Sequence, residues 1–511
     1  MLVAVATVYL AIVARYFTTQ LTSTQMNSDA ISAQVIAELY GHNSGAVYLG
    51  NIAWYSTLLF EWATGWLPAH RAIWDVGPYA IALCSIAVMA WTAWKVAGRS
   101  AACVTAALLI CASPTLLAQM FWLNNHMTTY YALALLAAYL VFLESHAAAV
   151  RKRILMPLAL VVGVIVGVNM ASDFLLVLVG PASLVLAGTV AWRLAPSAVS
   201  ARALAWGLVA VVVMAATTVV TIAVMRSAHI YKAPFRLAFA TTESIGANFR
   251  NWWESVAVLG NGAFFGETLS TSSVLSAVCA VLTIAAVLFT PRFAWKSLER
   301  WRARREQVNP MLSGYVIFWA TGCTLMSLVF IFSSAPVGLG TTRYLDGVIF
   351  ATAAIVPLWL ARGNITRMAV VAGSLVYCVA SINGVVQYET EPQQGVTPTV
   401  ARDVAEAAER LHATQGYAEF GFAASLTWLS HLKVRAYPFI VCPGRTNSMC
   451  PRALDAMSSW YELPPTERTF LITVAGQAFV PQREFGPPLA TYHFGVVTMT
   501  VYENSIGQYM K

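Results

Sequence analysis

Apolar stretches long enough to cross a lipid bilayer recur along most of this chain, and they constrain its fold more than any other feature. A bilayer core about 30 Å thick needs roughly 20 apolar residues in a helix. Such stretches make the sequence 58% hydrophobic and only 11% charged, against roughly 25% charged in globular proteins. The 511 residues are therefore predicted to form an α-helical polytopic membrane protein, not two or three soluble domains.

Eleven stretches are candidate membrane spans. The first, residues 2–18, has no basic residue before it and no small-residue cleavage site after it, so we expect a retained span and not a signal peptide. The missing basic start also favours an amino terminus upstream of Met1. The other candidates are 78–97, 101–117, 128–144, 154–169, 174–192, 203–225, 274–290, 311–333, 344–361 and 368–386.

The basic residues indicate how the spans are oriented. A net charge of +8 would suit a nucleic-acid partner, but fifteen of the 31 Lys and Arg residues lie in five short connections between spans. The positive-inside rule places such connections in the cytoplasm, so topology explains the charge and no nucleic acid is expected. The amino terminus is then cytoplasmic, and the segment after the eleventh span lies outside the plasma membrane.

Two predicted outer loops are long. The first long loop, residues 19–77, carries an amphipathic run over 29–40 and an aromatic run over 52–66. Both are expected to be helices, the second lying flat at the membrane interface. The second long loop, 226–273, combines basic and aromatic residues, as is typical of a segment beside the membrane. These loops belong to a predicted transmembrane domain over residues 1–387.

The segment from 388 to 511 has the composition of a small soluble domain, expected to be an α/β domain outside the cell. The pattern of apolar residues predicts a helix over 400–411. Strands are predicted over 434–441, 469–474 and 496–502, because these stretches are rich in β-branched residues.

Two of the eight cysteines stand apart from the membrane spans. Cys442 and Cys450 lie in the predicted outer domain, eight residues apart. A disulfide is predicted between them in an oxidising compartment, with two unpaired thiols as the alternative. A metal site is not expected there, because no CxxC motif or nearby His completes one.

Acidic residues on the predicted outer side are candidates for chemistry, because ionisable groups near a bilayer are costly and often functional. Asp29 is the sharpest, since it starts a predicted helix soon after the first span. It could accept a proton from an attacking hydroxyl, as a general base does. The alternative is that it only stabilises the helix amino terminus. The others are Glu38, Glu61, Asp75, Asp173, Glu243, Glu254, Glu267 and Asp346.

Arg343 and Tyr344 lie at the expected outer mouth of the tenth span, after Gly338 and Gly340. Arginine binds phosphate through two parallel hydrogen bonds, and glycines allow close approach of the backbone. We therefore predict a phosphate contact, with an anchor at the membrane interface as the alternative.

Further polar residues are expected to line the same outer vestibule. A single His is more often a hydrogen-bonded structural residue than a metal ligand, so no metal ligands are assigned. The vestibule candidates are Asn125, His126, Asp173, His70 and Arg71.

The layout resembles the membrane glycosyltransferases of the GT-C superfamily, most closely the protein mannosyltransferase and aminoarabinose transferase branch. The resemblance covers nearly the whole chain. It depends on Asp29 after the first span, the first long loop, and the segment 101–143 with Ser113-Pro114. The stretch 416–435 is similar to the outer domains of bacterial, especially actinobacterial, members.

This resemblance implies an inverting enzyme that moves a sugar from a polyprenyl-phosphate donor to a hydroxyl of a glycan, lipid or protein. It implies Asp29 as the catalytic residue and Arg343 as the donor phosphate contact. Many relatives have a second acidic residue where this chain has Ala30, and some have one in place of Asn125 and His126. No cofactor is therefore assigned, and a divalent metal stays open.

Two other classes of function are alternatives. A transporter or lipid flippase would show matched halves and charged or broken spans at mid-membrane, whereas the acidic residues here gather at loop edges. A scaffold for wall assembly would depend on its soluble domain, whereas an enzyme is expected to act on simple acceptors without it. The glycosyltransferase is the favoured interpretation.

Overall fold

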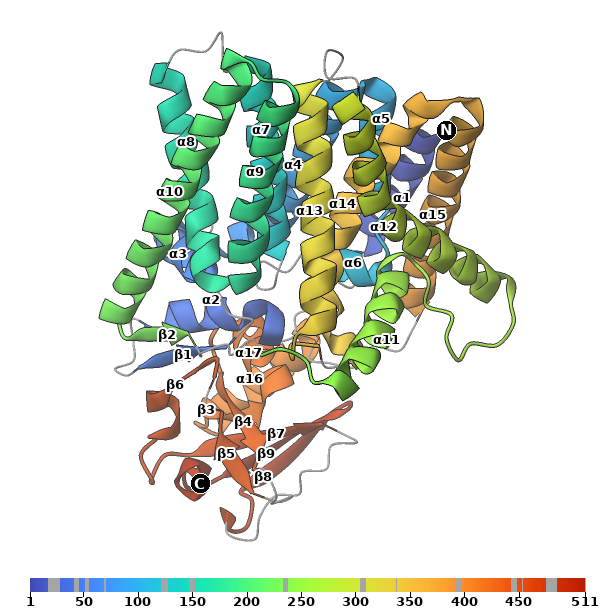
Figure 1. Cartoon of the computed structure of the whole chain (residues 1–511). Coiled ribbons are helices and arrows are strands. Elements are labelled where there is room, and N and C mark those ends of the chain that lie inside the picture. The colour runs from blue at the N-terminus through green and yellow to red at the C-terminus, as the bar shows by residue number, and fades with distance from the viewer. Residues whose placement is uncertain are drawn as a thin grey trace. The chain divides into compact units, whose positions relative to one another are not determined.

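The computed structural model of the chain forms two compact units (Figure 1). The helical unit consists of Met1–Ala14, Ala72–Ile222 and Phe235–Thr390, and the α/β unit of Arg15–Arg71, Ala223–Pro234 and Glu391–Lys511. The soluble domain predicted from residue 388 therefore belongs to the α/β unit from Glu391 onward. Most of the first long loop belongs to the same unit. The structure describes residues 1–16, 28–40, 46–50, 55–68, 70–120, 127–146, 152–232, 238–303, 309–336, 338–390, 397–442, 448–452, 454–474 and 485–510.

Long apolar helices make up the helical unit, as the sequence predicts. Nine of the helices in the described ranges are long and apolar enough to cross a bilayer. The chain is thus a multi-pass membrane protein with a C-terminal sheet domain. The helices of this unit are α1 (Leu2–Tyr16), α4 (His70–Ala97), α5 (Arg99–Ile110), α6 (Pro114–Met120), α7 (Met127–His146), α8 (Lys152–Ser172), α9 (Phe174–Leu194), α10 (Ala198–Ser227), α11 (Thr242–Leu259), α12 (Thr271–Ala303), α13 (Pro310–Phe332), η3 (Gly338–Leu345), α14 (Asp346–Ile355), η4 (Val356–Arg362) and α15 (Asn364–Thr390).

Two of the eleven predicted spans differ in the structure. The span predicted over 101–117 is a bent pair, α5 and α6, which meet at 90°. The break follows from Ser113 and Pro114, because the Ser113 hydroxyl accepts the Leu116 N–H at 3.1 Å and a proline at the first position favours a new helix start. The first predicted span, 2–18, corresponds to α1, which is 15 residues long and shorter than the nine.

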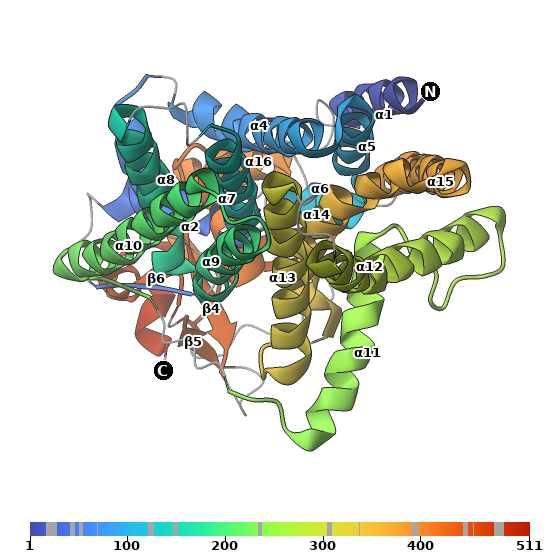
Figure 2. The same ribbon diagram turned by 45° about the horizontal axis from the view of Figure 1, so that its top comes forward.

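Helix α13 lies in the middle of the helical unit, with α9 on one side and α12 on the other (Figure 2). It also packs against α7 and α14. Its large side chains Tyr315, Phe318 and Trp319 are buried in these contacts. This helix therefore forms the core of the bundle.

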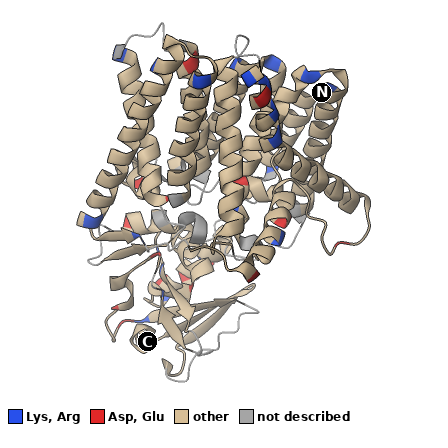
Figure 3. Ribbon diagram, viewed as in Figure 1, with Lys and Arg blue, Asp and Glu red and all other residues tan. Residues whose placement is uncertain are grey.

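Most lysines and arginines of the helical unit gather at one end of the helices, which we call the basic end (Figure 3). This is the end that the sequence predicts to be cytoplasmic. Helices α7, α9 and α14 place their amino-terminal ends at the opposite end, so Asp173, Arg343 and Asp346 lie there. The residues at the basic end include Lys95, Arg99, Arg153, Arg193, Arg202, Arg300, Arg302, Arg362 and Arg367.

A six-stranded sheet forms the core of the α/β unit, in the order β5-β4-β3-β7-β9-β8. The three central strands are parallel, and the outer pairs are antiparallel. Apolar side chains of α16 and α17 pack on it around Phe470 and Met499. The predicted helix and three predicted strands correspond to α16, β4, β7 and β9. The elements are α16 (Pro398–Arg410), β3 (Gln415–Glu419), α17 (Phe420–Leu429), β4 (Arg435–Val441), β5 (Met449–Pro451), η5 (Ser458–Tyr461), β7 (Thr469–Val474), β8 (Ala490–Phe494), β9 (Val497–Tyr502) and η7 (Ile506–Tyr509).

A second, smaller sheet joins three distant parts of the chain. It consists of β2 (Ile230–Lys232), β1 (Val47–Leu49) and β6 (Ala456–Met457) in that order, with β1 and β2 parallel and β1 and β6 antiparallel. The first long loop, the second long loop and the C-terminal segment each contribute one strand. This pairing explains why the α/β unit is discontinuous in the sequence.

The first long loop also forms two helices, α2 (Ser28–Tyr40) and α3 (Tyr55–Thr64), where the sequence predicts them. Helix α2 packs on both α3 and α17. Its residues Val35, Ile36 and Leu39 are buried. The position of α3 at the membrane interface stays a prediction.

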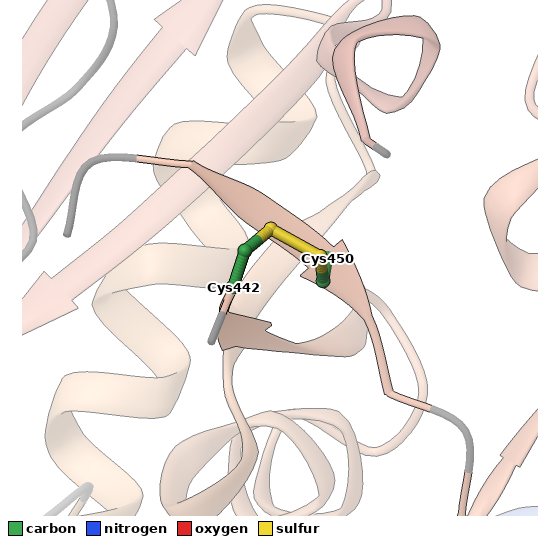
Figure 4. Close-up of a disulfide and its surroundings, with 2 residues drawn as sticks. All are labelled: Cys442 and Cys450. Atoms are coloured by element: carbon green, nitrogen blue, oxygen red, sulfur yellow. A yellow bond between two sulfur atoms is a disulfide. The ribbon is translucent and has the colours of Figure 1, made fainter. Parts of the chain in front are cut away.

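The structure joins Cys442 and Cys450 by a disulfide, which links the end of β4 to β5 (Figure 4). The two strands are antiparallel neighbours, so their ends already lie side by side. The bond closes a loop with a sequence separation of 8 residues. The disulfide thus attaches β5, the edge strand of the six-stranded sheet, to its neighbour β4.

Replacing both cysteines by serine is expected to destabilise the α/β unit by about 2 to 3 kcal/mol, because a cross-link over so short a loop removes that much chain entropy from the unfolded state. Thermal unfolding of the purified protein would measure this loss. Cys103→Ser is the control, since Cys103 is an exposed free cysteine. A double variant as stable as this control would contradict the prediction.

Candidate functional site

Of the predicted catalytic, phosphate-binding and vestibule residues, the structure describes three side chains, namely Asp173, Arg343 and Tyr344. Asp29 is the second residue of α2, and His70 and Arg71 are the first two of α4, but these three side chains lie outside the described part. Asn125 and His126 lie outside the described residues altogether. The geometry of the site is therefore built around Arg343.

Arg343 lies on η3, the short helix that leads directly into α14. Its guanidinium lies over the ring of Tyr344, 5.8 Å from the ring centre, within the range of cation–π attraction. Its backbone carbonyl accepts a hydrogen bond from the Tyr130 hydroxyl at 2.5 Å. The backbone at this arginine is thus fixed to α7, while the side chain is only half-buried.

Asp346 follows Arg343 by three positions, as the first residue of α14, and only 1% of its surface is exposed. The side-chain amide of Gln119 on α6, with its nitrogen toward the carboxylate, donates to both oxygens of Asp346 at 2.5 and 2.8 Å. The positive charge of Arg343 also acts favourably on this carboxylate. The helix amino terminus favours a negative charge at the same place. Burying a carboxylate is costly without such partners.

Asp173 is the N-cap of α9 and is 4% exposed. Its carboxylate accepts the Leu175 N–H at 2.9 Å and a hydrogen bond from the Thr129 hydroxyl. Thr129 and Tyr130 are neighbours in the first turn of α7, and Tyr130 binds the Arg343 carbonyl. The first turn of α7 therefore brings together two predicted site residues, Asp173 and Arg343.

Gly347 allows this arrangement to pack closely. A Cβ atom at this position would lie 2.6 Å from ring carbons of Tyr130 and 2.5 Å from the Met326 sulfur. The Tyr130 ring is fully buried, so it has no open space into which to move. Only glycine leaves room for the ring whose hydroxyl binds Arg343.

Gly347→Ala is expected to destabilise the helical unit by about 1 to 3 kcal/mol, because overpacking a close-packed core costs that much. Thermal unfolding in detergent would measure it. Gly207→Ala on α10 is the matched control, since a Cβ there meets nothing within 4 Å, and alanine favours a helix by about 1 kcal/mol. Equal unfolding midpoints for the two variants would show that the Tyr130 ring does not restrict residue 347.

Sequence reasoning did not assign Gln119, Tyr130 or Gly347 to the site, and it named Asp346 only among the outer acidic residues. Tyr130 and Gln119 lie in apolar stretches and carry no pattern of their own. Asp346 follows Arg343 by three residues, which is the one sequence signal that connects them. Among the described residues, no group of three or more His, Cys, Asp or Glu side chains could hold a metal ion.

Comparison with solved structures reveals a likeness over the full length. The crystal structure of ArnT from Cupriavidus metallidurans without ligand has a TM-score of 0.52 and 12% identity, over 99% of this chain and 98% of that chain. The same protein bound to undecaprenyl phosphate has a TM-score of 0.50 and 13% identity, over 98% and 97%.

The oligosaccharyltransferase of Archaeoglobus fulgidus is less similar, with a TM-score of 0.48 and 12% identity over 85% of this chain and 62% of that chain. No protein-family model matches the sequence, and neither does any curated protein. At these identities the likeness to ArnT shows a common fold.

Proposed function

This chain has the GT-C fold, and we propose that it is a membrane glycosyltransferase that takes a sugar from a polyprenyl-phosphate donor. The acceptor is a hydroxyl group of a cell-envelope glycan, a glycolipid or a protein, and the configuration at the anomeric carbon is inverted. The observation that carries the proposal is the full-length likeness to ArnT, a protein crystallised with undecaprenyl phosphate. The reaction takes place at the end of the helical unit opposite the basic end, on the outer face of the plasma membrane.

Arg343 binds the donor phosphate in this proposal. It lies at the proposed reacting end, its backbone is fixed by Tyr130, and its side chain is half-buried, so the guanidinium can meet a ligand without large movement. A guanidinium matches two phosphate oxygens at once. The negative charge of the nearby Asp346 attracts this guanidinium.

Asp29 acts as the general base. Its carboxylate takes the proton of the acceptor hydroxyl as that oxygen forms a bond to the anomeric carbon. The bond between the anomeric carbon and the phosphate oxygen breaks, and polyprenyl phosphate leaves with the electron pair. Arg343 stabilises the negative charge that develops on this leaving group.

The lipid carrier suits the position of the proposed site. A polyprenyl chain stays in the bilayer while its phosphate and sugar lie at the surface, so the donor reaches the helix ends by lateral diffusion. Such a donor needs no nucleotide-binding loop, and none is evident in the sequence.

The test is to incubate the purified protein with a panel of polyprenyl-phosphate sugars and membrane acceptors, and to measure release of polyprenyl phosphate. Turnover of one donor, dependent on an acceptor, would support the proposal and identify the sugar. A folded sample that turns over no donor would contradict it and favour transport of a lipid or a scaffold role.

A further inference from the structure

Asp455 connects the C-terminal segment to the first long loop inside the α/β unit. Its carboxylate is buried and accepts the backbone N–H of Gly50 at 2.7 Å. Its own N–H donates to the carbonyl of Tyr48 at 2.7 Å. Two hydrogen bonds from one residue therefore hold residues 48–50 beside the start of β6, where β1 and β6 pair.

The contact at Gly50 leaves no room for a side chain. A Cβ atom there would collide with the Asp455 carboxylate. Asp455 itself has a φ of 56°, a conformation that Asp and Asn adopt more readily than most residues. The close approach therefore needs a glycine at position 50, and position 455 needs a residue that tolerates a positive φ.

Arg452 extends the connection to α17. It forms an ion pair with Asp455 at 3.4 Å, and its Nε donates to the Leu454 carbonyl at 2.8 Å. Its guanidinium lies 3.4 Å from the ring centre of Phe420, the first residue of α17. We call Gly50, Asp455, Arg452 and Phe420 the Asp455 cluster. It links the first long loop to the helix on which α2 packs.

Helix α2 depends on the same support. Its residues Ile36 and Leu39 are fully buried, and the helix packs directly on α17. The second residue of α2 is Asp29. The path from the cluster to this aspartate therefore stays within one compact unit.

We infer that Asp455 is a positioning residue for sugar transfer: by holding the first long loop on α17, it sets the place of α2 and hence of Asp29. The inference rests on the proposed function. A general base acts only within hydrogen-bond reach of the acceptor, so a small displacement of α2 lowers the rate of the chemical step without changing donor binding.

The first test compares Asp455→Ala with Asp455→Asn in the full-length protein. Asp455→Ala is expected to lower kcat by about tenfold to a hundredfold while the donor KM stays constant, because misplacing a reacting group by about 1 Å costs this much. Asn keeps an acceptor oxygen for Gly50 and tolerates the φ of 56°, so Asp455→Asn should retain most of the activity. Equal activity of Asp455→Ala and the native protein would overturn the inference.

The second test is a double-mutant cycle with Gly50. Gly50→Ala alone should lower kcat as Asp455→Ala does, because its Cβ displaces the carboxylate. The double variant should have the same kcat as either single variant, since Asp455→Ala removes the carboxylate with which the Cβ of residue 50 would collide. Independent, multiplying effects would contradict a direct contact. Glu503→Ala is the control, because it breaks the exposed ion pair with Arg468 on the other sheet and leaves the cluster intact.

Hydrogen exchange separates this inference from the proposed function. In Asp455→Ala and Gly50→Ala, the amides of 28–40 and 46–50 should exchange at least tenfold faster than in the native protein, whereas Glu503→Ala should leave them unchanged. This measurement needs no substrate, so it holds even for a protein that transfers no sugar. Unchanged protection in both variants would show that the cluster does not hold the loop.

Discussion

Asp29→Asn is expected to lower kcat for sugar transfer by roughly 10² to 10⁴-fold, because general-base catalysis contributes about this much and asparagine cannot accept the proton. The side chains are equal in size, and both suit the start of a helix. The unfolding midpoint should therefore stay within about 2 °C of the native value, since a substitution of equal size that suits the same helix start changes the stability little. The rate is measured as polyprenyl phosphate released in single-turnover conditions, so that product release does not mask the chemical step.

Glu243→Gln is the matched control for Asp29→Asn. Glu243 also lies in the first turn of a helix, α11, within a long loop, and it is exposed. Removing its charge changes the same kind of helix start without touching the proposed chemistry. If both variants lose activity equally and slightly, Asp29 serves only the helix terminus and the general-base role is wrong.

Arg343→Ala is expected to raise the KM for the donor by roughly tenfold to a hundredfold, since a hydrogen bond to a charged group contributes about 1.5 to 3 kcal/mol. Arg343→Lys should recover only part of the loss, because an ammonium group cannot bind two phosphate oxygens in the planar geometry of a guanidinium. Donor titrations at saturating acceptor would measure both. High salt should raise the donor KM of the native protein, because it screens the contact between Arg343 and phosphate, but should change the KM of Arg343→Ala little.

Arg250→Ala is the control for a general effect of positive charge. Arg250 is exposed on α11, where it pairs with Glu254 at 2.9 Å. Its removal should leave the donor KM unchanged. A rise in KM equal to that of Arg343→Ala would mean that bulk charge attracts the donor and that Arg343 makes no specific phosphate contact.

The helices and the longer strands could be predicted from the sequence because local pattern determines them. β4, β7 and β9 are rich in β-branched and aromatic residues, and α16 has a regular apolar face. β3, with the sequence Gln-Gly-Tyr-Ala-Glu, has no such pattern and is a strand because two parallel neighbours pair with it. Non-local pairing of this kind leaves no local signal.

The bend between α5 and α6 has a signal in the sequence, but the signal is weak beside the apolar composition around it. Ser113-Pro114 is a typical helix start, and the continuous apolar composition of 101–117 concealed it. The Arg343 site was predictable only in part for a different reason. Arg343 is recognisable in the sequence because it is a charged residue at the end of a span. Tyr130 and Gly347 are not, because their roles depend on contacts between residues more than two hundred positions apart.

The packing of α2 on α17 also changes how the scaffold alternative can be tested. The sequence alone predicts that an enzyme acts on simple acceptors without its soluble domain. In the structure the C-terminal segment covers the helix that carries Asp29. Removing that segment is therefore expected to abolish transfer in an enzyme as well as binding in a scaffold, so only the point variants distinguish the two.

The small sheet of β1, β2 and β6 has a consequence for the number of membrane crossings. Strands that pair through backbone hydrogen bonds lie on one side of a bilayer, so the chain has to cross an even number of times between any two of them. Four of the nine long apolar helices in the described ranges lie between β2 and β6, but five lie between β1 and β2. The parity is restored only when the bent pair α5 and α6 counts as a sixth crossing. We therefore expect the right-angled pair to be a broken span that crosses the membrane and not a re-entrant loop.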